Sequence, residues 1–166
     1  MYQGTDNIQL VYMELPSSTG RGTGRLGDRV GYELKRVQHD LRLGMDAELK
    51  ELEVTTPQYA ALSVLAEEPG LSNAALARRS FVTPQTMNQI LVRLEAAGLV
   101  ERVAHPEHGR VLQGYLTKEG ERLRQKCAER VDTVEERMLS GLSEDERADL
   151  LVLLRRCSAT LRQEDG

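Results

Sequence analysis

The 166-residue sequence is poor in aromatic side chains: it contains no Trp and only one Phe, and aromatics make up 4% of it. It has no apolar run of about 18 residues, the length that a membrane-spanning helix needs. Its start lacks the basic-then-apolar layout of a secretory signal, so we expect a cytoplasmic protein. With so few aromatics, Leu, Ala and Val must supply most of the core, which favours a mainly helical fold.

Cysteine is also scarce: Cys127 and Cys157 are the two present, and they form no metal or redox motif. Both fall in apolar stripes, where Cys usually acts as a small buried hydrophobe. Three possible metal ligands, without a cysteine partner, share one turn: His105, Glu107 and His108. No pairing of nucleophile and base stands out, so we expect no metal, no cofactor and no enzymatic activity.

Charge is unevenly distributed along the chain, which carries −4 overall. Residues 72–120 hold six basic and four acidic residues, a net charge of +2, so the remainder carries −6. A mildly basic middle between acidic flanks is the pattern expected if only the middle meets phosphate groups.

The two ends of the chain differ from its middle. Residues 1–27 are expected to form a flexible or partner-packing arm, because glycines alternate with polar residues near its end. Apolar residues at steps of three and four predict helices at 28–50, 117–140 and 143–162. Ser143 opens the last of these with a capping-box sequence.

Thr-Pro pairs mark helix starts in the middle of the chain. Thr56-Pro57 predicts a helix with Thr56 as its N-cap, and Thr83-Pro84 predicts another that runs to about Ala97. Ser72 caps a short helix between them. Gly98 then supplies a left-handed exit.

The periodicity changes to two after this glycine. Residues 99–104 and 111–117 alternate between apolar and polar around the turn at 105–109, which predicts a β-hairpin. A short helix, the three-residue connection at 80–82 and a second helix precede it. That order is typical of a helix-turn-helix, whose second helix enters the DNA major groove with its N-terminal end first.

The second helix has the side chains for this task. It has no acidic residue between Thr83 and Val92 that would repel phosphate. Asn and Gln can pair with adenine edges, and Thr can contact a thymine methyl. We therefore expect DNA contacts from Thr83, Pro84, Gln85, Thr86, Asn88, Gln89 and Arg93. Near the tip of the hairpin, Arg110 suits a narrow minor groove, and His108 lies beside it.

Three stretches of the sequence resemble the MarR (multiple antibiotic resistance regulator) family. They are Val54 to Tyr59, Val82 to Arg102, and Arg110 with Leu116 to Gly120. The resemblance implies a winged helix-turn-helix in a triangular homodimer, bound to a palindromic operator. It further implies a repressor that a small, often phenolic, ligand releases. We therefore predict a mainly α fold with a small β-hairpin wing, plus a helical dimerisation region.

The resemblance also implies a ligand pocket between the first helix and the winged unit, where Arg36, His39 and Tyr59 could hold an aromatic anion. Two departures stand out. The family usually has an Asp two residues before the wing Arg, where this chain has His108, and the arm is longer than expected.

A dimer also follows from the residues alone, because the small winged unit cannot cover every apolar stripe of the flanking helices. We expect one domain at 28–166, with dimerisation helices at 28–52 and 117–162 around a winged unit at 55–116. Two recognition helices would then lie about 34 Å apart, one turn of DNA. Two alternatives stay open: a redox-sensing regulator acting through Cys127 or Cys157, and a protein-interaction module without DNA binding.

Overall fold

The computed structural model describes residues 25–106 and 111–163. Contacts between Cα atoms divide the chain into two compact units, Met1–Val37 and Gln38–Gly166. The described part of the first unit holds a short 3-10 helix, η1 (Leu26–Asp28), and the beginning of helix α1 (Val30–Leu49). The second unit contains the other elements. Most of the predicted arm at 1–27 lies outside the described residues, so it stays a prediction.

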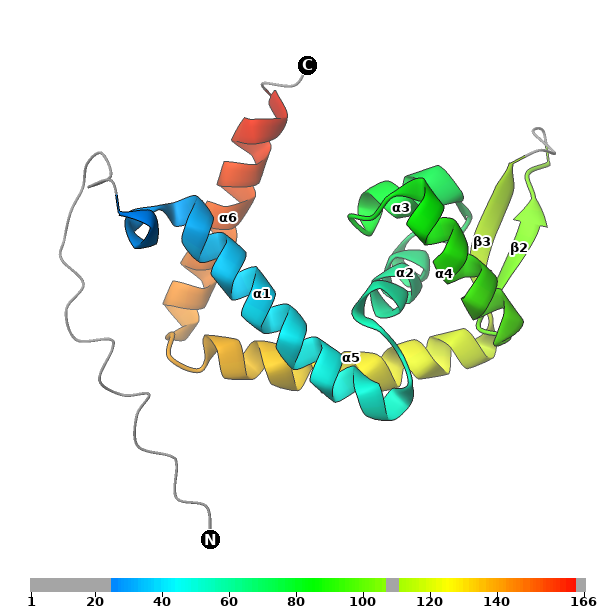
Figure 1. Cartoon of the computed structure of the whole chain (residues 1–166), viewed down its shortest axis with the longest axis horizontal. Helices are drawn as coiled ribbons and strands as arrows, with labels where there is room; N and C mark the ends of the chain where they lie inside the picture. Colours follow the sequence, from blue (N-terminus) through cyan, green and yellow to red (C-terminus); the bar gives the residue numbers. More distant parts are fainter. Residues whose placement is uncertain (1–24, 107–110, 164–166) are drawn as a thin grey trace, which may run out of the picture. The chain divides into compact units, whose positions relative to one another are not determined.

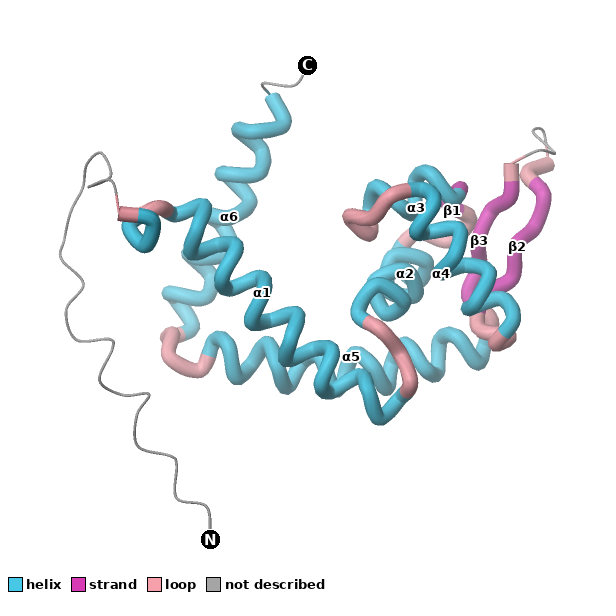
Figure 2. The backbone as a smooth tube through the Cα atoms, viewed as in Figure 1, coloured by secondary structure: helices cyan, strands magenta, loops and turns pink. Residues whose placement is uncertain are grey.

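The second unit is mainly helical and carries one small sheet (Figures 1 and 2). After α1 come η2 (Lys50–Leu52), α2 (Thr56–Glu67), β1 (Leu71–Ser72), α3 (Asn73–Arg79), α4 (Pro84–Ala96), β2 (Val100–Ala104), β3 (Leu112–Leu116), α5 (Lys118–Leu139) and α6 (Glu144–Gln163). The predicted fold class, mainly α with a hairpin wing, is confirmed. The observed helix ends lie within about two residues of the predicted ones, the usual uncertainty of such boundaries.

Side-chain caps begin the helices. Thr83, at the start of α4, accepts a hydrogen bond from the backbone of Thr86, as the sequence predicts. The prediction for α2 is wrong by one residue, because Thr55 and not Thr56 is the N-cap. Thr55 stands three residues before Gln58, whose Oε1 accepts from the Thr55 backbone N–H at 2.9 Å. This reciprocal capping box decides between two adjacent threonines.

The sheet has three antiparallel strands in the order β1-β3-β2, so β3 is central. Residue Gly114 of β3 lies opposite Arg102 on one side and Leu71 on the other. The two-residue strand β1 was not predicted. Gly70, in the left-handed conformation with φ of 83°, turns the chain into it and donates its backbone N–H to the Gly114 carbonyl at 2.9 Å.

Two apolar clusters form the interior. The larger one joins α2, α3, α4 and the sheet; its buried members are Ala61, Leu62, Leu65, Leu76, Ala77, Met87, Ile90, Leu91, Leu94 and Val100. The smaller one joins the end of α1, the start of α2 and the middle of α5; its buried members are Leu49, Val54, Cys127 and Val131. The first cluster fixes α4 against the sheet, and the second attaches α5 to α2.

The end of α4, the start of β2 and the first turn of α5 are locked together. Gly98 leaves α4 with φ of 70°, the expected left-handed exit. Thr117 donates its hydroxyl to the Gly98 carbonyl at 2.7 Å and its backbone N–H to the Leu99 carbonyl at 3.1 Å. A Cβ atom on Gly120 would overlap that Leu99 carbonyl oxygen, so glycine is needed here.

Helix α6 exposes a series of large apolar side chains to solvent. They include Leu150, Leu151, Val152, Leu153, Leu154 and Leu161, which are 37–67% exposed. None of the helices in residues 25–106 and 111–163 combines the length and apolarity needed to cross a bilayer.

Candidate nucleic-acid interface

Helix α4 presents a polar face to solvent because its apolar face is anchored. Met87, Ile90, Leu91 and Leu94 are buried in the larger cluster, and Met87 is 0% exposed. The side chains predicted to contact DNA lie on the other side and are all exposed: Thr83, Pro84, Gln85, Thr86, Asn88, Gln89 and Arg93. The structure thus brings these predicted residues together on one accessible surface.

The first turn of α4 is held from within and from α3. The hydroxyls of Thr83 and Thr86 lie 2.9 Å apart and share a hydrogen bond. Asn73 of α3 donates its side-chain amide to the Pro84 carbonyl at 3.0 Å. No acidic residue occurs in this turn. The N-terminal end of α4 is therefore fixed in position and free of charge that would repel a phosphate.

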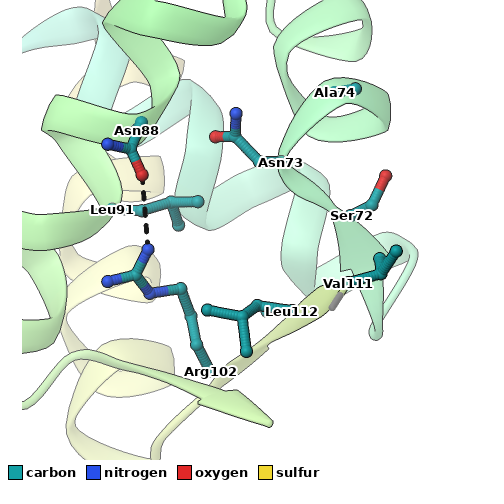
Figure 3. A pocket seen from close by; sticks show the side chains of 9 residues that line it. Ser72, Asn73, Ala74, Asn88, Leu91, Arg102, Val111 and Leu112 are labelled. Atoms are coloured by element: carbon teal, nitrogen blue, oxygen red, sulfur yellow. Dashed lines mark hydrogen bonds between the residues drawn. The ribbon is translucent and has the colours of Figure 1, made fainter. Parts of the chain in front are cut away.

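Arg102, on β2, connects the hairpin to α4 (Figure 3). Its guanidinium donates to the Asn88 side-chain carbonyl at 3.4 Å and to the Glu95 carboxylate at 3.0 Å through Nε. The side chain of Arg102 is only 17% exposed. The sequence reasoning missed this residue, because its partners lie on another element, 7 and 14 positions away. It fixes the orientation of Asn88, one of the predicted base-reading side chains.

A pocket of about 380 Å³ lies between α3, α4 and the hairpin. Figure 3 shows Arg102 and Asn88 on one side of it and Asn73 and Ser72 on the other. Leu91 adds an apolar surface. The pocket therefore combines one cation with several hydrogen-bonding groups directly beside the exposed face of α4.

The hairpin is the expected wing. Strands β2 and β3 pair from Val100↔Leu116 to Ala104↔Leu112, and the His105 backbone N–H continues the ladder to the Val111 carbonyl at 2.8 Å. The predicted DNA contacts at its tip, His108 and Arg110, lie outside the described residues. Their roles stay predictions.

Basic side chains beside α4 differ in their availability. Arg79, at the end of α3, forms ion pairs with Glu68 at 2.6 Å and Glu67 at 3.6 Å, which partly neutralise it. Arg78 and Arg93 are exposed. Arg78 lies in the last turn of α3 and Arg93 in the last turn of α4, so both are available for contacts to phosphate.

The predicted ligand-binding residues lie in different surroundings. Arg36, in the first unit, forms an ion pair with Glu33 at 3.2 Å. His39 is exposed on α1. Tyr59 is half-buried against the smaller apolar cluster. Their role as a ligand site stays a prediction.

The two thiols also differ. Cys127 is fully buried, and burial raises its pKa above the ordinary value of a thiol. A reactive cysteine needs the opposite, an accessible sulfur with a lowered pKa. Cys157 is exposed on α6. In the part of the chain that the structure describes, no group of three His, Cys, Asp or Glu side chains could hold a metal ion.

Comparisons with known proteins agree with this geometry. A family model described as MarR family matches residues 52–111, from the last residue of η2 to the residue before β3. The HTH-type transcriptional repressor Rv2887 of Mycobacterium tuberculosis is 38% identical over 125 residues, which cover 75% of this chain and 90% of that protein. The chain belongs to the MarR family.

Solved structures place the MarR fold over most of the chain. That of the M. tuberculosis MarR family protein Rv2887 in complex with salicylic acid matches with a TM-score of 0.66 and 37% identity, over 78% of this chain and 96% of that one. The complex of Rv2887 with DNA matches with a TM-score of 0.65 and 34% identity, over 78% and 97%. The α3–α4 pair and the hairpin are thus the winged helix-turn-helix of a MarR-family chain.

Proposed function

We propose that this chain binds double-stranded DNA as a homodimer on a palindromic operator and represses transcription until a small aromatic anion releases it. The observation that carries the proposal is the exposed, polar and acid-free start of α4, held rigidly by a buried apolar face. A relative of the same family, Rv2887, has been solved both with DNA and with salicylic acid.

Each side chain on α4 has a role that follows from its chemistry. Gln85, Asn88 and Gln89 are exposed amides that can read base edges in the major groove. The Thr86 methyl can contact a thymine methyl while its hydroxyl bonds to Thr83. Arg93, further along the helix, contacts phosphate. On the wing, Arg110 and His108 would contact the minor groove or the backbone.

A second copy of the chain would cover the exposed leucines of α6. In the single chain these side chains keep 37–67% of their surface in water, and burial of that remainder would contribute about 1 kcal/mol for each. A two-fold axis would also give the DNA two equivalent α4 helices. The operator is then a palindrome whose half-sites lie about 10 base pairs apart.

Selection from a random duplex pool, followed by footprinting, tests the proposal directly. We expect a palindromic consensus bound by the dimer. Arg93→Ala should weaken binding to all sequences alike and lower the salt slope by about two ions, because each dimer loses two phosphate contacts. Gln89→Ala should instead relax the consensus at one position per half-site. Arg122→Ala, on the exposed surface of α5, is the matched control for charge. A pool that yields no enriched duplex would contradict the proposal.

Release by a ligand is tested on the selected operator with salicylate. We expect salicylate to dissociate the complex, and we expect the affinity measured by calorimetry to fall in Tyr59→Ala, His39→Ala and Arg36→Ala. If salicylate binds but these variants bind it equally well, the proposed ligand site is wrong, although the DNA-binding function stands.

A further inference from the structure

The connection between α3 and α4 holds an aromatic side chain out in water. Phe81, the single Phe of the chain, is 96% exposed, more than any other large apolar side chain that the structure describes. Its backbone is not loose: Phe81 donates its N–H to the Arg78 carbonyl at 3.3 Å, and Val82 donates to the Ala77 carbonyl at 3.0 Å. The fold therefore fixes the backbone from which the phenyl group projects into water.

The backbone at this position is unfavourable for a bulky residue. Phe81 has a φ of 55°, in the left-handed region that glycine adopts without strain. In the described residues, Glu53 shares this conformation among non-glycine residues, with the same φ of 55°. Glu53 is polar and suits an exposed turn, whereas Phe81 adds an exposed apolar surface to the strain. Neither the core nor the turn accounts for a phenylalanine here.

The surroundings of Phe81 favour a polyanion as the molecule that covers it. The sequence from Leu71 to Leu94 contains three arginines and not a single Asp or Glu, although Arg79 is paired with Glu67 and Glu68 from α2 and its end. Phe81 stands two residues before Thr83, the N-cap of α4, so it borders the face that we propose enters the major groove. Arg78, at the end of α3, is exposed beside it.

We infer that Phe81 is a DNA-contacting side chain, whose ring packs against deoxyribose and a thymine methyl at the edge of the groove that α4 enters. This inference rests on the proposed function. An aromatic ring supplies apolar contact to a thymine methyl over a larger surface than the single methyl of Thr86 offers. The hydrogen-bonded turn fixes the backbone from which the ring projects, so the backbone needs no rearrangement before the ring contacts DNA.

Three variants and one control test this on the selected operator. Phe81→Gly removes the ring and the strain, and Phe81→Asn removes the ring but keeps a residue that tolerates the left-handed region. Phe81→Tyr retains the ring. Glu53→Gly is the matched control, because it relieves the same backbone conformation away from α4.

We expect Phe81→Gly to raise the melting temperature by about 2–4 °C and both ring-deleting variants to bind the operator about tenfold more weakly. Their salt slope should not change, because no phosphate contact is lost. Phe81→Tyr should bind within about twofold of the parent chain, and Glu53→Gly should gain stability without a change in affinity. Replacing thymine by uracil at the flanking positions should weaken the parent and have no further effect on Phe81→Gly.

Parent-like operator binding by Phe81→Gly and Phe81→Asn overturns this inference and leaves the proposed function intact. A parent chain that binds no duplex overturns both. If sedimentation shows that Phe81→Gly dissociates into monomers, the ring is covered by a second copy of the chain, and the inference is also overturned.

Discussion

The guanidinium of Arg102 adds a polar connection between the wing strand β2 and helix α4 to the apolar packing of the larger cluster. It reaches Asn88 near the start of the exposed face and Glu95 near its end. Ion pairs on open surfaces contribute little, since solvent and side-chain entropy offset them. Here the Arg102 side chain is mostly covered, but Glu95 is 40% exposed. The interaction joins two elements that both face the proposed groove, so its main effect is on geometry.

Arg102→Lys is expected to weaken operator binding about five- to tenfold while costing about 1 kcal/mol of stability or less. Lysine keeps the charge but cannot hold Asn88 and Glu95 at once, because it lacks the planar fork of donors. Fluorescence anisotropy gives the affinity, and urea unfolding gives the stability. Arg122→Lys, on an exposed ion pair of α5, should change neither. Full operator affinity in Arg102→Lys would show that the bridge has no part in orienting α4.

Cys127 is expected to be almost inert in the folded protein. Burial raises its pKa, and its sulfur has no access to solvent. Alkylation in the native state should be at least ~100-fold slower than in denaturant, as measured by mass spectrometry, because reaction requires local opening. Cys157, which is exposed in the single chain, is the internal comparison. Fast native labelling of Cys127 would favour this thiol in the redox-sensing alternative, which stays open for Cys157.

The raised pKa of Cys127 also predicts how the free energy of unfolding changes with pH. Because the folded pKa lies above the unfolded one, the contribution of this thiol is complete below the unfolded pKa and is lost as pH rises through the folded one. We expect the free energy of unfolding to fall on the alkaline side and expect Cys127→Ala to lessen that fall. Equal pH slopes for the two proteins in urea titrations would contradict this.

At the scale of elements, the caps of α2 and α4 offer a matched pair. Thr55 and Thr83 each accept a hydrogen bond from the third residue of the helix that follows. Thr55→Ala and Thr83→Ala should each cost about 1 kcal/mol of unfolding free energy. Only Thr83→Ala should also weaken operator binding, because it loosens the end of α4 that enters the groove. A loss of DNA affinity in both variants would point to global destabilisation as its cause.

Gly120, in the first turn of α5, is the most sterically constrained glycine of the described residues. A Cβ atom there would overlap the backbone carbonyl of Leu99, which cannot move without shifting β2. Gly120→Ala should therefore destabilise the protein by about 3 kcal/mol. Gly141→Ala, where a Cβ atom would meet nothing within 4 Å, should be nearly neutral. Thermal unfolding of the two variants distinguishes a real clash from a general intolerance of alanine.

Local patterns in the sequence predict most of this architecture. Thr83-Pro84 and Gly98 mark both ends of α4, since cap chemistry and the left-handed exit depend only on neighbouring residues. The start of α2 is one residue off because two adjacent threonines can both cap a helix, and the side chain of Gln58 decides between them. Strand β1 was missed since two residues carry no periodicity, and its pairing with β3 depends on the tertiary fold.

In the candidate site too, some residues could be predicted from local sequence patterns and others depend on the tertiary fold. The exposed residues of α4 were predicted because buried and exposed positions follow the helical repeat. Two other features were not predicted from the sequence: the hydrogen bond from Arg102 to Asn88 and the exposed ring of Phe81. The first requires the packing of β2 on α4, and the second requires the backbone angles of one turn.

At the scale of the whole molecule, solubility and assembly are linked through α6. Its exposed leucines make a single chain of 18.6 kDa an unfavourable species in water. Sedimentation should find about twice that mass. Leu151→Asp with Leu154→Asp should shift the protein toward monomer and weaken operator binding more than tenfold, because each half-site then binds alone. Thr160→Asp, a charge change elsewhere on the helix, is the control. A monomeric parent chain that binds the full palindrome would contradict the dimer.

The junction at Gly98, Thr117 and Gly120 has a mechanical consequence. Helix α5 has 22 residues and is therefore about 33 Å long, and its first turn is clamped to the exit of α4. If α5 tilts by about 5° about one of its ends, the other end moves by about 3 Å, since the helix is about 33 Å long. In the proposed dimer, a molecule that separates the α5 helices of the two copies would thus change the distance between their α4 helices without contacting a base-reading side chain.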